Sequence, residues 1–329
     1  MKRLIAFALL LNAALLGVIA WQLVTDNHNT DRQAYAADKD EILKHMSIVE
    51  LPIDDKGGKA KTIRFSGVNV QVVNGTGKTG QIQDGLANGL GNLIVGYQEL
   101  READKYSATD DTNDRSGSHN LVVGSGNNYS IWGGQVVGYR NTISGKLSTV
   151  SGGEYNTASG VSSTVSGGCW NMVSAGRSVI SGGCGNFITD AASDSTVSGG
   201  YKNQASSVSS TISGGQNNTA SGDASTIGGG NWNTASGKLS TVGGGGVIRE
   251  ISPTGGLPVR WFKVRDDSRP LVGNRASATY STVSGGKENI ASGEGAAVSG
   301  GRDNRARGDW SRVSGGYGLE ANAENIRRP

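Results

Sequence analysis

Two cysteines have the spacing in this chain that most directly suggests covalent chemistry. Cys169 and Cys184 lie 15 positions apart, and each directly follows a Gly-Gly pair. The same 15-residue step recurs through most of the chain, so the two cysteines occupy equivalent positions of successive repeats. If such positions stack like neighbouring β-strands, their Cα atoms lie about 4.8 Å apart, within the range that a disulfide spans. We expect a structural Cys169–Cys184 disulfide, with two free stacked thiols as the alternative.

The densest mixture of aromatic and cationic residues is the segment LPVRWFKVR. Trp261 and Phe262 are flanked there by Arg260, Lys263 and Arg265. Aromatic and arginine side chains are enriched among the residues that dominate binding energies. We therefore expect a ligand or partner contact at Arg260, Trp261, Phe262 and Arg265. The alternative is that Trp261 packs against the rest of the fold or a neighbouring subunit.

Histidines and carboxylates do not form a recognisable catalytic or metal-binding pattern. The three histidines do not recur with the repeat, so neither a Ser-His-Asp triad nor a metal cluster is predicted. Acidic residues of the repeats occur singly, unlike the paired carboxylates of glycosidases. The loop DDTNDRSG at 110–117 has oxygen ligands for a weak calcium site, although we favour a solvated acidic loop. We expect no cofactor and no catalytic activity, with a polysaccharide-acting enzyme as a less favoured alternative.

Two columns of residues recur with a step of 15. The step lengthens to 17 between Asn186 and Asn203, and 26 additional residues separate Asn233 from Asn274. The asparagine column is Asn141, Asn156, Asn171, Asn186, Asn203, Asn218, Asn233, Asn274, Asn289 and Asn304, and the aliphatic column is Val150, Val165, Ile180, Val197, Ile212, Ile227, Val242, Val283, Val298 and Val313.

Each repeat contains two short segments, of the type S-T-V-S and N-T-A-S, that alternate with period two. Such alternation predicts β-strands, and repetition without hairpin signals predicts parallel stacking of successive coils. Val150 and Ala158 share the inward parity. We expect Gly152 and Gly153 to supply positive φ at the corners, and the asparagine side chains to exchange amide hydrogen bonds along the stack. The predicted fold is all-β, a parallel β-solenoid of 15-residue coils with two short strands per coil.

The chain divides into segments of different character. Lys2 and Arg3 precede an apolar run over residues 4–24, which is typical of an export signal or an uncleaved membrane anchor. An amphipathic stretch at 38–50 predicts a short capping helix. The expected boundaries are 1–36 for the signal or anchor with its tether, 37–88 for an N-terminal cap of a short helix plus strands, 89–244 for coils with an acidic loop at 99–117, 245–271 for an inserted hairpin, 272–320 for further coils and 321–329 for a tail.

Composition restricts both the core and the partners. Fifty-three of the 329 residues are glycine and only 6% are aromatic, so the apolar volume suffices for a thin core alone. A net charge of +3 is too small to indicate a nucleic-acid partner. Because a thin coil gains most by packing against copies of itself, we expect a homo-oligomer.

The repeats, such as STVSGGEYNTASG at 148–160, resemble the head domains of trimeric autotransporter adhesins, the YadA-like parallel β-roll. The resemblance covers about residues 89–318. It implies left-handed coils, a homotrimer and display outside the cell, where such proteins bind host or matrix surfaces. The period is one residue longer than in that family, and we expect neither its coiled-coil stalk nor its membrane barrel within this sequence.

Together these observations predict an exported cell-surface protein with a structural or adhesive role. Matrix, glycan or cell-surface molecules are the expected partners. Outward threonines and serines, such as Thr149 and Ser151, support an alternative, because regular threonine arrays on flat solenoids occur in ice-binding proteins.

Overall fold

The computed structural model describes residues 39–53, 57–75, 77, 79, 87–102, 113–246 and 273–329. The chain forms two compact units, Met1–Gln71 and Val72–Pro329. The predicted signal or anchor at 1–36 and almost all of the predicted inserted hairpin lie outside the described residues. Among the residues that are described, no helix has the length and apolarity needed to cross a membrane.

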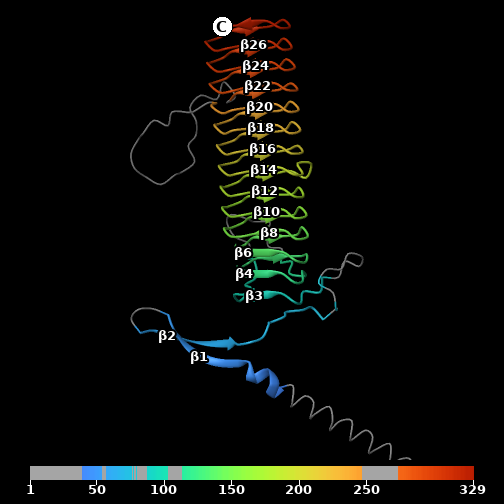
Figure 1. Ribbon diagram of the computed structural model, residues 1–329, viewed down its shortest axis with the longest axis vertical. Coiled ribbons are helices and arrows are strands. Elements are labelled where there is room, and N and C mark those ends of the chain that lie inside the picture. The colour runs from blue at the N-terminus through green and yellow to red at the C-terminus, as the bar shows by residue number, and fades with distance from the viewer. Residues whose placement is uncertain are drawn as a thin grey trace, which may run out of the picture. The chain divides into compact units, whose positions relative to one another are not determined.

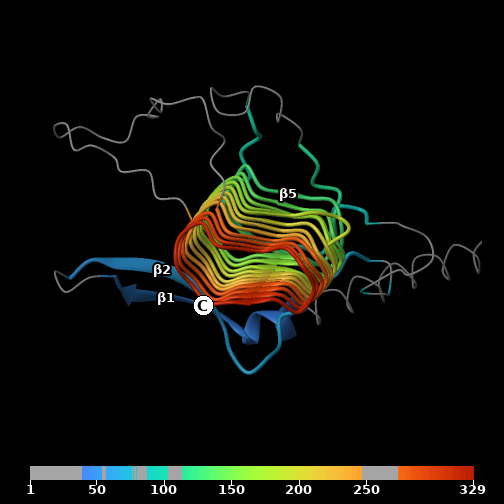
Figure 2. The ribbon, with the colours of Figure 1, turned by 90° about the horizontal axis from the view of Figure 1, so that it is seen from above.

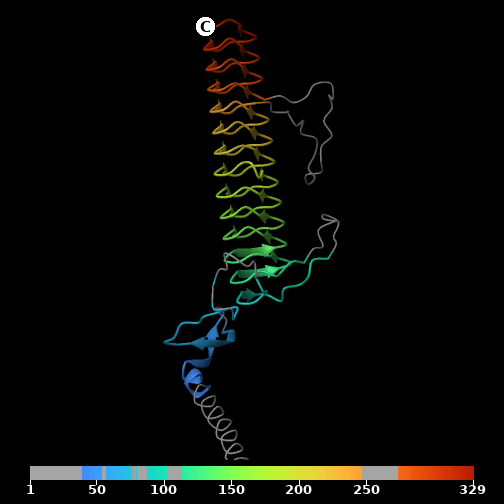
Figure 3. The ribbon, with the colours of Figure 1, turned by 90° about the vertical axis from the view of Figure 1, so that its right-hand side faces the viewer.

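The second unit is a parallel β-solenoid whose coils stack one above another (Figures 1 and 3). This confirms the predicted all-β fold with two short strands per 15-residue coil. One sheet contains β3 (Leu93–Val95), β4 (Leu121–Ser125), β6 (Gln135–Tyr139), β8 (Thr149–Val150), β10 (Thr164–Val165), β12 (Val179–Ile180), β14 (Thr196–Val197), β16 (Thr211–Ile212), β18 (Thr226–Ile227), β20 (Thr241–Val242), β22 (Thr282–Val283), β24 (Ala297–Val298), β26 (Arg312–Val313) and β28 (Arg327–Arg328). The other contains β5 (Asn128–Tyr129), β7 (Thr142–Ile143), β9 (Thr157–Ala158), β11 (Met172–Val173), β13 (Phe187–Ile188), β15 (Gln204–Ala205), β17 (Thr219–Ala220), β19 (Thr234–Ala235), β21 (Arg275–Ala276), β23 (Ile290–Ala291), β25 (Arg305–Ala306) and β27 (Glu320–Ala321).

The register of the sheets follows the repeat, including where the spacing in the sequence changes. Val165 pairs with Val150 on one side and with Ile180 on the other. Val242 pairs directly with Val283 across the long insertion. The register is therefore the same on both sides of the insertion.

A third parallel ladder, which was not predicted from the sequence, runs along the solenoid. It consists of single-residue bridges rather than strands, so it leaves no two-residue alternation in the sequence. Its members are Tyr139, Glu154, Cys169, Cys184, Tyr201, Gln216, Asn231 and Gly246, followed by Lys287, Arg302 and Tyr317. Viewed along the stack, the coils superpose into one closed outline (Figure 2).

The core is a narrow line of aliphatic side chains from both sheets. Every member of the aliphatic column, from Val150 to Val313, is essentially inaccessible to solvent, as are the alanines that follow Ala158 in the other sheet. A column of serines shares this interior. The Oγ atoms of Ser163, Ser225 and Ser240 have no hydrogen-bond partner among the described residues, and Ala296 occupies the equivalent place in its own coil. Packing, rather than hydrogen bonding, therefore fixes this small residue in those coils.

The buried asparagines bind mainly the backbone, and this corrects the expected amide-to-amide ladder. The Oδ1 atom of Asn156 accepts a hydrogen bond from the backbone N–H of Asn171, at 3.0 Å. Its Nδ2 atom donates to the carbonyls of Gly152 in its own coil and Gly168 in the next. A direct side-chain pair forms between Asn186 and Asn171, at 3.1 Å. The asparagine side chains bind backbone groups rather than one another because the backbone groups lie at fixed positions in every coil, whatever the outward residues are.

The corners depend on more than glycine. Gly153 has a φ of 79° and a Cβ there would lie 2.0 Å from the carbonyl oxygen of Gly168, so only glycine fits. Gly152, by contrast, does not have the expected positive φ. Tyr155 and Ser162 adopt φ values of 55° and 56° at two further corners. Such left-handed conformations are unfavourable for residues with a Cβ, and the stacked neighbours hold them in place.

The coils continue into the residues expected to form a tail. Glu320 and Ala321 pair with the preceding coil through β27, and Arg327 and Arg328 do so through β28. Because arginine is a poor core residue, this last coil was not predicted from the sequence. Both β28 residues are solvent-exposed, and parallel pairing of the backbone alone places them.

In the described part of the first unit, residues 39–44 are helical. They are followed by the antiparallel hairpin of β1 (Met46–Pro52) and β2 (Lys59–Phe65). The amphipathic stretch at 38–50 is thus helical only in its first half. From Met46 onward, β-branched residues pair across the hairpin, for example Ile48 with Ile63, and this pairing is stronger than the helical tendency of so short a segment.

Replacing one column asparagine should loosen two coils. The Asn218→Ala substitution removes two donated bonds, to the carbonyls of Gly214 and Gly230, and the bond accepted from the N–H of Asn233. We expect a loss of about 3 kcal/mol in unfolding free energy and faster hydrogen exchange at the Asn233 amide, measured by denaturant unfolding and by mass spectrometry. The exposed Gln216→Ala is the matched control, and equal effects of the two substitutions would contradict the prediction.

Candidate functional site

A column of partly exposed aromatic residues follows the corner just before the buried asparagines. We call Tyr139, Tyr155, Trp170, Tyr201, Trp232 and Tyr317 the aromatic corner. Three of them belong to the bridge ladder, and the other three directly precede a column asparagine. For Tyr155, Trp170 and Trp232 the next residue is an asparagine whose side chain makes three hydrogen bonds, as Asn156 does, so the backbone beneath these three rings is firmly placed.

The rings at the lower end of this corner pack on one another. Tyr155 and Trp170 are stacked with ring centroids 4.3 Å apart and an interplanar angle of 4°. Tyr139 contacts Tyr155 edge-on, with centroids 5.7 Å apart at 87°. Both are favourable geometries for aromatic pairs. Trp170 nevertheless remains 43% exposed, so the stack ends in a surface that a ligand can reach.

Cationic side chains accompany the rings. The guanidinium of Arg140 lies 5.6 Å from the Tyr139 ring centroid and 5.8 Å from that of Tyr155. The Nζ atom of Lys202 lies 5.1 Å from the ring centroid of Tyr201. These distances allow cation–π attraction. The aromatic corner therefore presents both stacking faces and positive charge, a combination suited to binding and not to bond cleavage.

A disulfide fastens two coils at this corner. In the structure it joins Cys169 to Cys184, with the Cα atoms 4.6 Å apart. The two residues also form a parallel bridge. Each cysteine directly precedes a corner residue, Trp170 or Gly185, so the bond restrains the coils on which these residues stand.

The binding residues proposed from the sequence, Arg260, Trp261, Phe262 and Arg265, lie outside the described residues, and their role stays a prediction. The aromatic corner was missed, although the sequence carries a signal for it. The triplets EYN, CWN and NWN place an aromatic residue directly before the column asparagine in three repeats. The first two of these triplets belong to successive coils, and stacking their equivalent positions brings the rings of Tyr155 and Trp170 together.

Metal-ligating side chains do not cluster in the part of the chain that the structure describes. No group of three or more His, Cys, Asp or Glu residues is placed to hold a metal ion there. The weak calcium loop is described only from residue 113, where Asp114 accepts hydrogen bonds from the N–H and Oγ of Ser116. His119 lies at a corner with a φ of 55°, and its Nε2 accepts a bond from the N–H of Asn74.

One ion pair supports the coil that contains 17 residues. Arg177 donates from Nε and Nη2 to the two carboxylate oxygens of Asp194, at 2.7 and 2.8 Å. These bonds hold the pKa of the Asp194 carboxyl below its usual value. The pair therefore stabilises the fold above the unfolded-state pKa and loses its effect as the pH falls through the lowered one. Both side chains are exposed, so the contribution is small.

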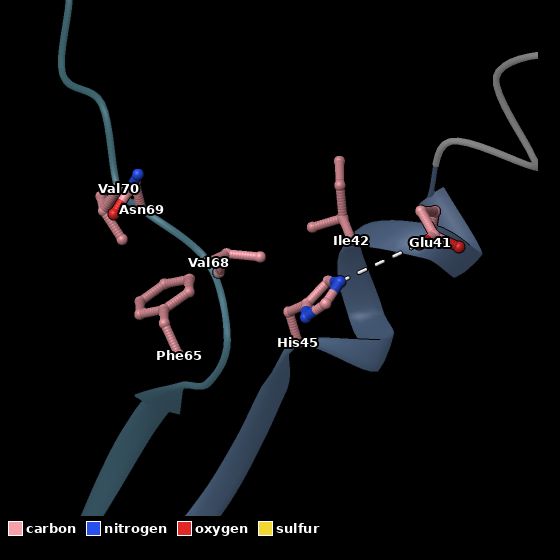
Figure 4. Close-up of a pocket in the computed structure, with 7 residues that line it drawn as sticks. All are labelled: Glu41, Ile42, His45, Phe65, Val68, Asn69 and Val70. Atoms are coloured by element: carbon pink, nitrogen blue, oxygen red, sulfur yellow. Dashed lines mark ion pairs between the residues drawn. The ribbon is translucent and has the colours of Figure 1, made fainter.

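A pocket of about 430 Å³ lies within the first unit (Figure 4). His45 is fixed there by a 2.9 Å contact between Nδ1 and the carbonyl of Ser66, and its Nε2 lies 3.9 Å from Glu41. The rest of the lining is mostly apolar. The residues that line it are Glu41, Ile42, His45, Phe65, Val68, Asn69 and Val70.

The threonine and serine columns of the ice-binding alternative lie on the outward side of one sheet. Thr149 and Thr164 pair in register and are partly exposed, while Ser151 and Ser166 are exposed. Val179 interrupts the threonine column in the next coil. This alternative stays untested by the geometry.

Comparison with protein families identifies two matching segments. Residues 195–206 and 281–293 match the family model described as ubiquitous surface protein adhesin repeat. Each segment begins at a buried serine and runs through both strands of one coil, β14 with β15 and β22 with β23. The comparison with curated proteins gives no match.

Reducing the disulfide should weaken the solenoid locally without unfolding it. The bond closes a 15-residue loop, which corresponds to up to about 3 kcal/mol in the chain-entropy description. We expect a reductant to lower the unfolding free energy of the native chain by at most that amount. The Cys169→Ser, Cys184→Ser double variant is the control and should not respond to reductant. If the unsubstituted chain shows two titratable thiols after denaturation without reductant, the disulfide is absent and the prediction is wrong.

Proposed function

We propose that this protein is an exported, non-enzymatic repeat protein that presents its solenoid at the cell surface and adheres to matrix, glycan or cell-surface molecules. The observation that carries the proposal is the match of two separate coils to an adhesin repeat. The remaining coils follow the same column pattern and register, so the adhesin likeness extends naturally to them. The resemblance to adhesin heads also favours left-handed winding.

The outward surface of the coils fits an adhesive role. The interior takes the same few residue types in coil after coil, while outward positions vary freely without changing the register. The aromatic corner supplies rings such as Trp170 and Trp232, which are 43% and 39% exposed. Exposed tryptophan on a rigid support is a common energetic centre of binding surfaces.

We further propose that the chain assembles into a homotrimer, with the hairpin of the first unit contributing to the contact. Ile48 and Ile63 pair across the strands and are 73% and 60% exposed. Phe65 lies on the same face and is 50% exposed. A two-stranded hairpin is marginally stable by itself, and clustered exposed apolar residues mark contact surfaces. Copies of the chain that meet through this face would bury it.

Adhesion can be measured directly on the purified, folded chain. We expect saturable binding to at least one immobilised matrix protein, glycan or intact cell surface. Replacing Tyr155, Trp170 and Trp232 together by alanine should weaken it about tenfold or more. Trp310→Ala, at a different corner, is the control. Thermal hysteresis without adhesion would instead support ice binding, and polysaccharide turnover would support an enzyme.

The assembly state is measured by light scattering and sedimentation of the native chain. We expect a trimer, and we expect Ile48→Glu to shift the chain toward monomer because it places a charge within the apolar face. Ser47→Glu introduces the same charge on the opposite face of β1 and should leave the trimer intact. A native chain that is monomeric at micromolar concentration would overturn the proposed assembly.

A further inference from the structure

The upper face of Trp170 is the open end of the ring stack. Tyr155 and Trp170 belong to successive coils, and their parallel rings are separated by nearly the rise of one coil. The ring planes therefore lie roughly across the solenoid axis. One face of the indole is covered by Tyr155, and the other points toward the level of the following coil.

That following level carries no side chain at the equivalent position, because the residue there is Gly185. A Cβ built on Gly185 meets only one neighbour within 4 Å, the Cγ atom of Lys202, at 3.4 Å. Trp170 does not fold over the glycine. A slot one coil high therefore lies between the indole of Trp170 and the side chain of Lys202.

A glycine at a different corner, Gly295, shows that such a space is not always left open. At Gly295, a Cβ would lie 2.4 Å from the Cε3 atom of Trp310, so the indole of Trp310 already occupies the space over that glycine. Both glycines have positive φ, at 69° and 60°. The space beside the glycine is thus occupied by an indole at Gly295 and is not occupied by one at Gly185.

Trp170 and Gly185 stand on coils that the disulfide joins, since Cys169 and Cys184 directly precede them. The backbone N–H of Gly185 also donates to the carbonyl of Cys169, at 2.8 Å. The floor of the slot is therefore held at a fixed height, which reduces the ordering cost of binding a ligand there.

We propose that this slot binds one acidic sugar residue of a glycan, such as a hexuronic acid. The inference rests on the proposed adhesive function and assigns it a ligand class and a place. The C–H groups on one face of a pyranose ring carry partial positive charge and pack well on the negative face of an indole. The 4.3 Å separation of the existing ring pair shows that one level of the stack accommodates one ring.

The choice of an acidic sugar follows from the charge at the upper edge. Lys202 is exposed, and its Cγ atom lies 3.4 Å from a Cβ built on Gly185. Its ammonium lies 5.1 Å from the ring centroid of Tyr201, and a carboxylate at this edge of the slot would meet that positive charge. The nearest carboxylate of the bridge ladder, Glu154, lies on the Tyr155 side of Trp170, away from that edge. The slot therefore favours a ring whose anionic group points toward Lys202.

Calorimetry with two oligosaccharides of equal length tests the proposal. One alternates glucuronic acid with N-acetylglucosamine, and the other is the neutral oligomer of N-acetylglucosamine. We expect the native chain to bind the acidic oligomer more tightly, and Trp170→Ala to weaken that binding about tenfold or more. Lys202→Met should abolish the preference for the acidic oligomer while binding of the neutral one is retained.

Filling the slot supplies a variant that keeps the fold. Gly185→Tyr places a ring where other coils already carry Tyr155, Trp170 and Trp232 in the same backbone conformation, so it should fold and lose acidic-oligomer binding about tenfold or more. Trp310→Ala removes an exposed tryptophan at a different corner; it is the control and should leave the affinity unchanged. Unchanged affinity in both Trp170→Ala and Gly185→Tyr overturns the slot, as does a native chain that binds neither oligomer. If such a chain still adheres to matrix or cells, the proposed function stands and only the slot fails.

Discussion

Each buried asparagine fixes the next coil, and the rest of the solenoid depends on that contact. Asn156 holds the amide of Asn171 and two glycine carbonyls while it is completely removed from water. Hydrogen bonds inside a water-free interior are costly to leave unmade, so every level is positioned by the one below. The bond persists from Asn233 to Asn274, at 2.9 Å, although 41 positions separate them in the sequence.

This constraint separates the roles of inward and outward residues. The interior needs small or β-branched side chains of nearly constant volume, and the corner needs glycine where backbones approach closely, as at Gly153. Outward positions experience neither requirement. Aromatic, cationic and acidic residues accumulate there. Those that directly precede an asparagine, such as Tyr155 and Trp170, stand on backbone that the asparagine holds in place, and they require no change in the core.

Much of the fold follows from residue periodicity, because a regular stack imposes the same environment on every fifteenth residue. The aliphatic column, the two strands per coil and the position of the long insertion were therefore predictable. The left-handed backbone at Tyr155 and the single-residue bridges were not, because neither requires a particular residue type. The candidate site was harder still. Composition indicated Trp261 as the binding residue. The Tyr155–Trp170 contact, by contrast, depends on a coil rise that places two rings at stacking distance. The role of Gly185 becomes visible only when its neighbours in the adjacent coils are known.

The pairing of Val242 with Val283 across the insertion has an evolutionary consequence. Since the contacts above and below any level are of the same kind, a whole level can be gained or lost in one step without the need for a new interface. Slippage during copying of a repetitive gene would then lengthen or shorten the reach of the molecule in units of one coil. Selection can thus change the length of the solenoid separately from the residues that its corners present.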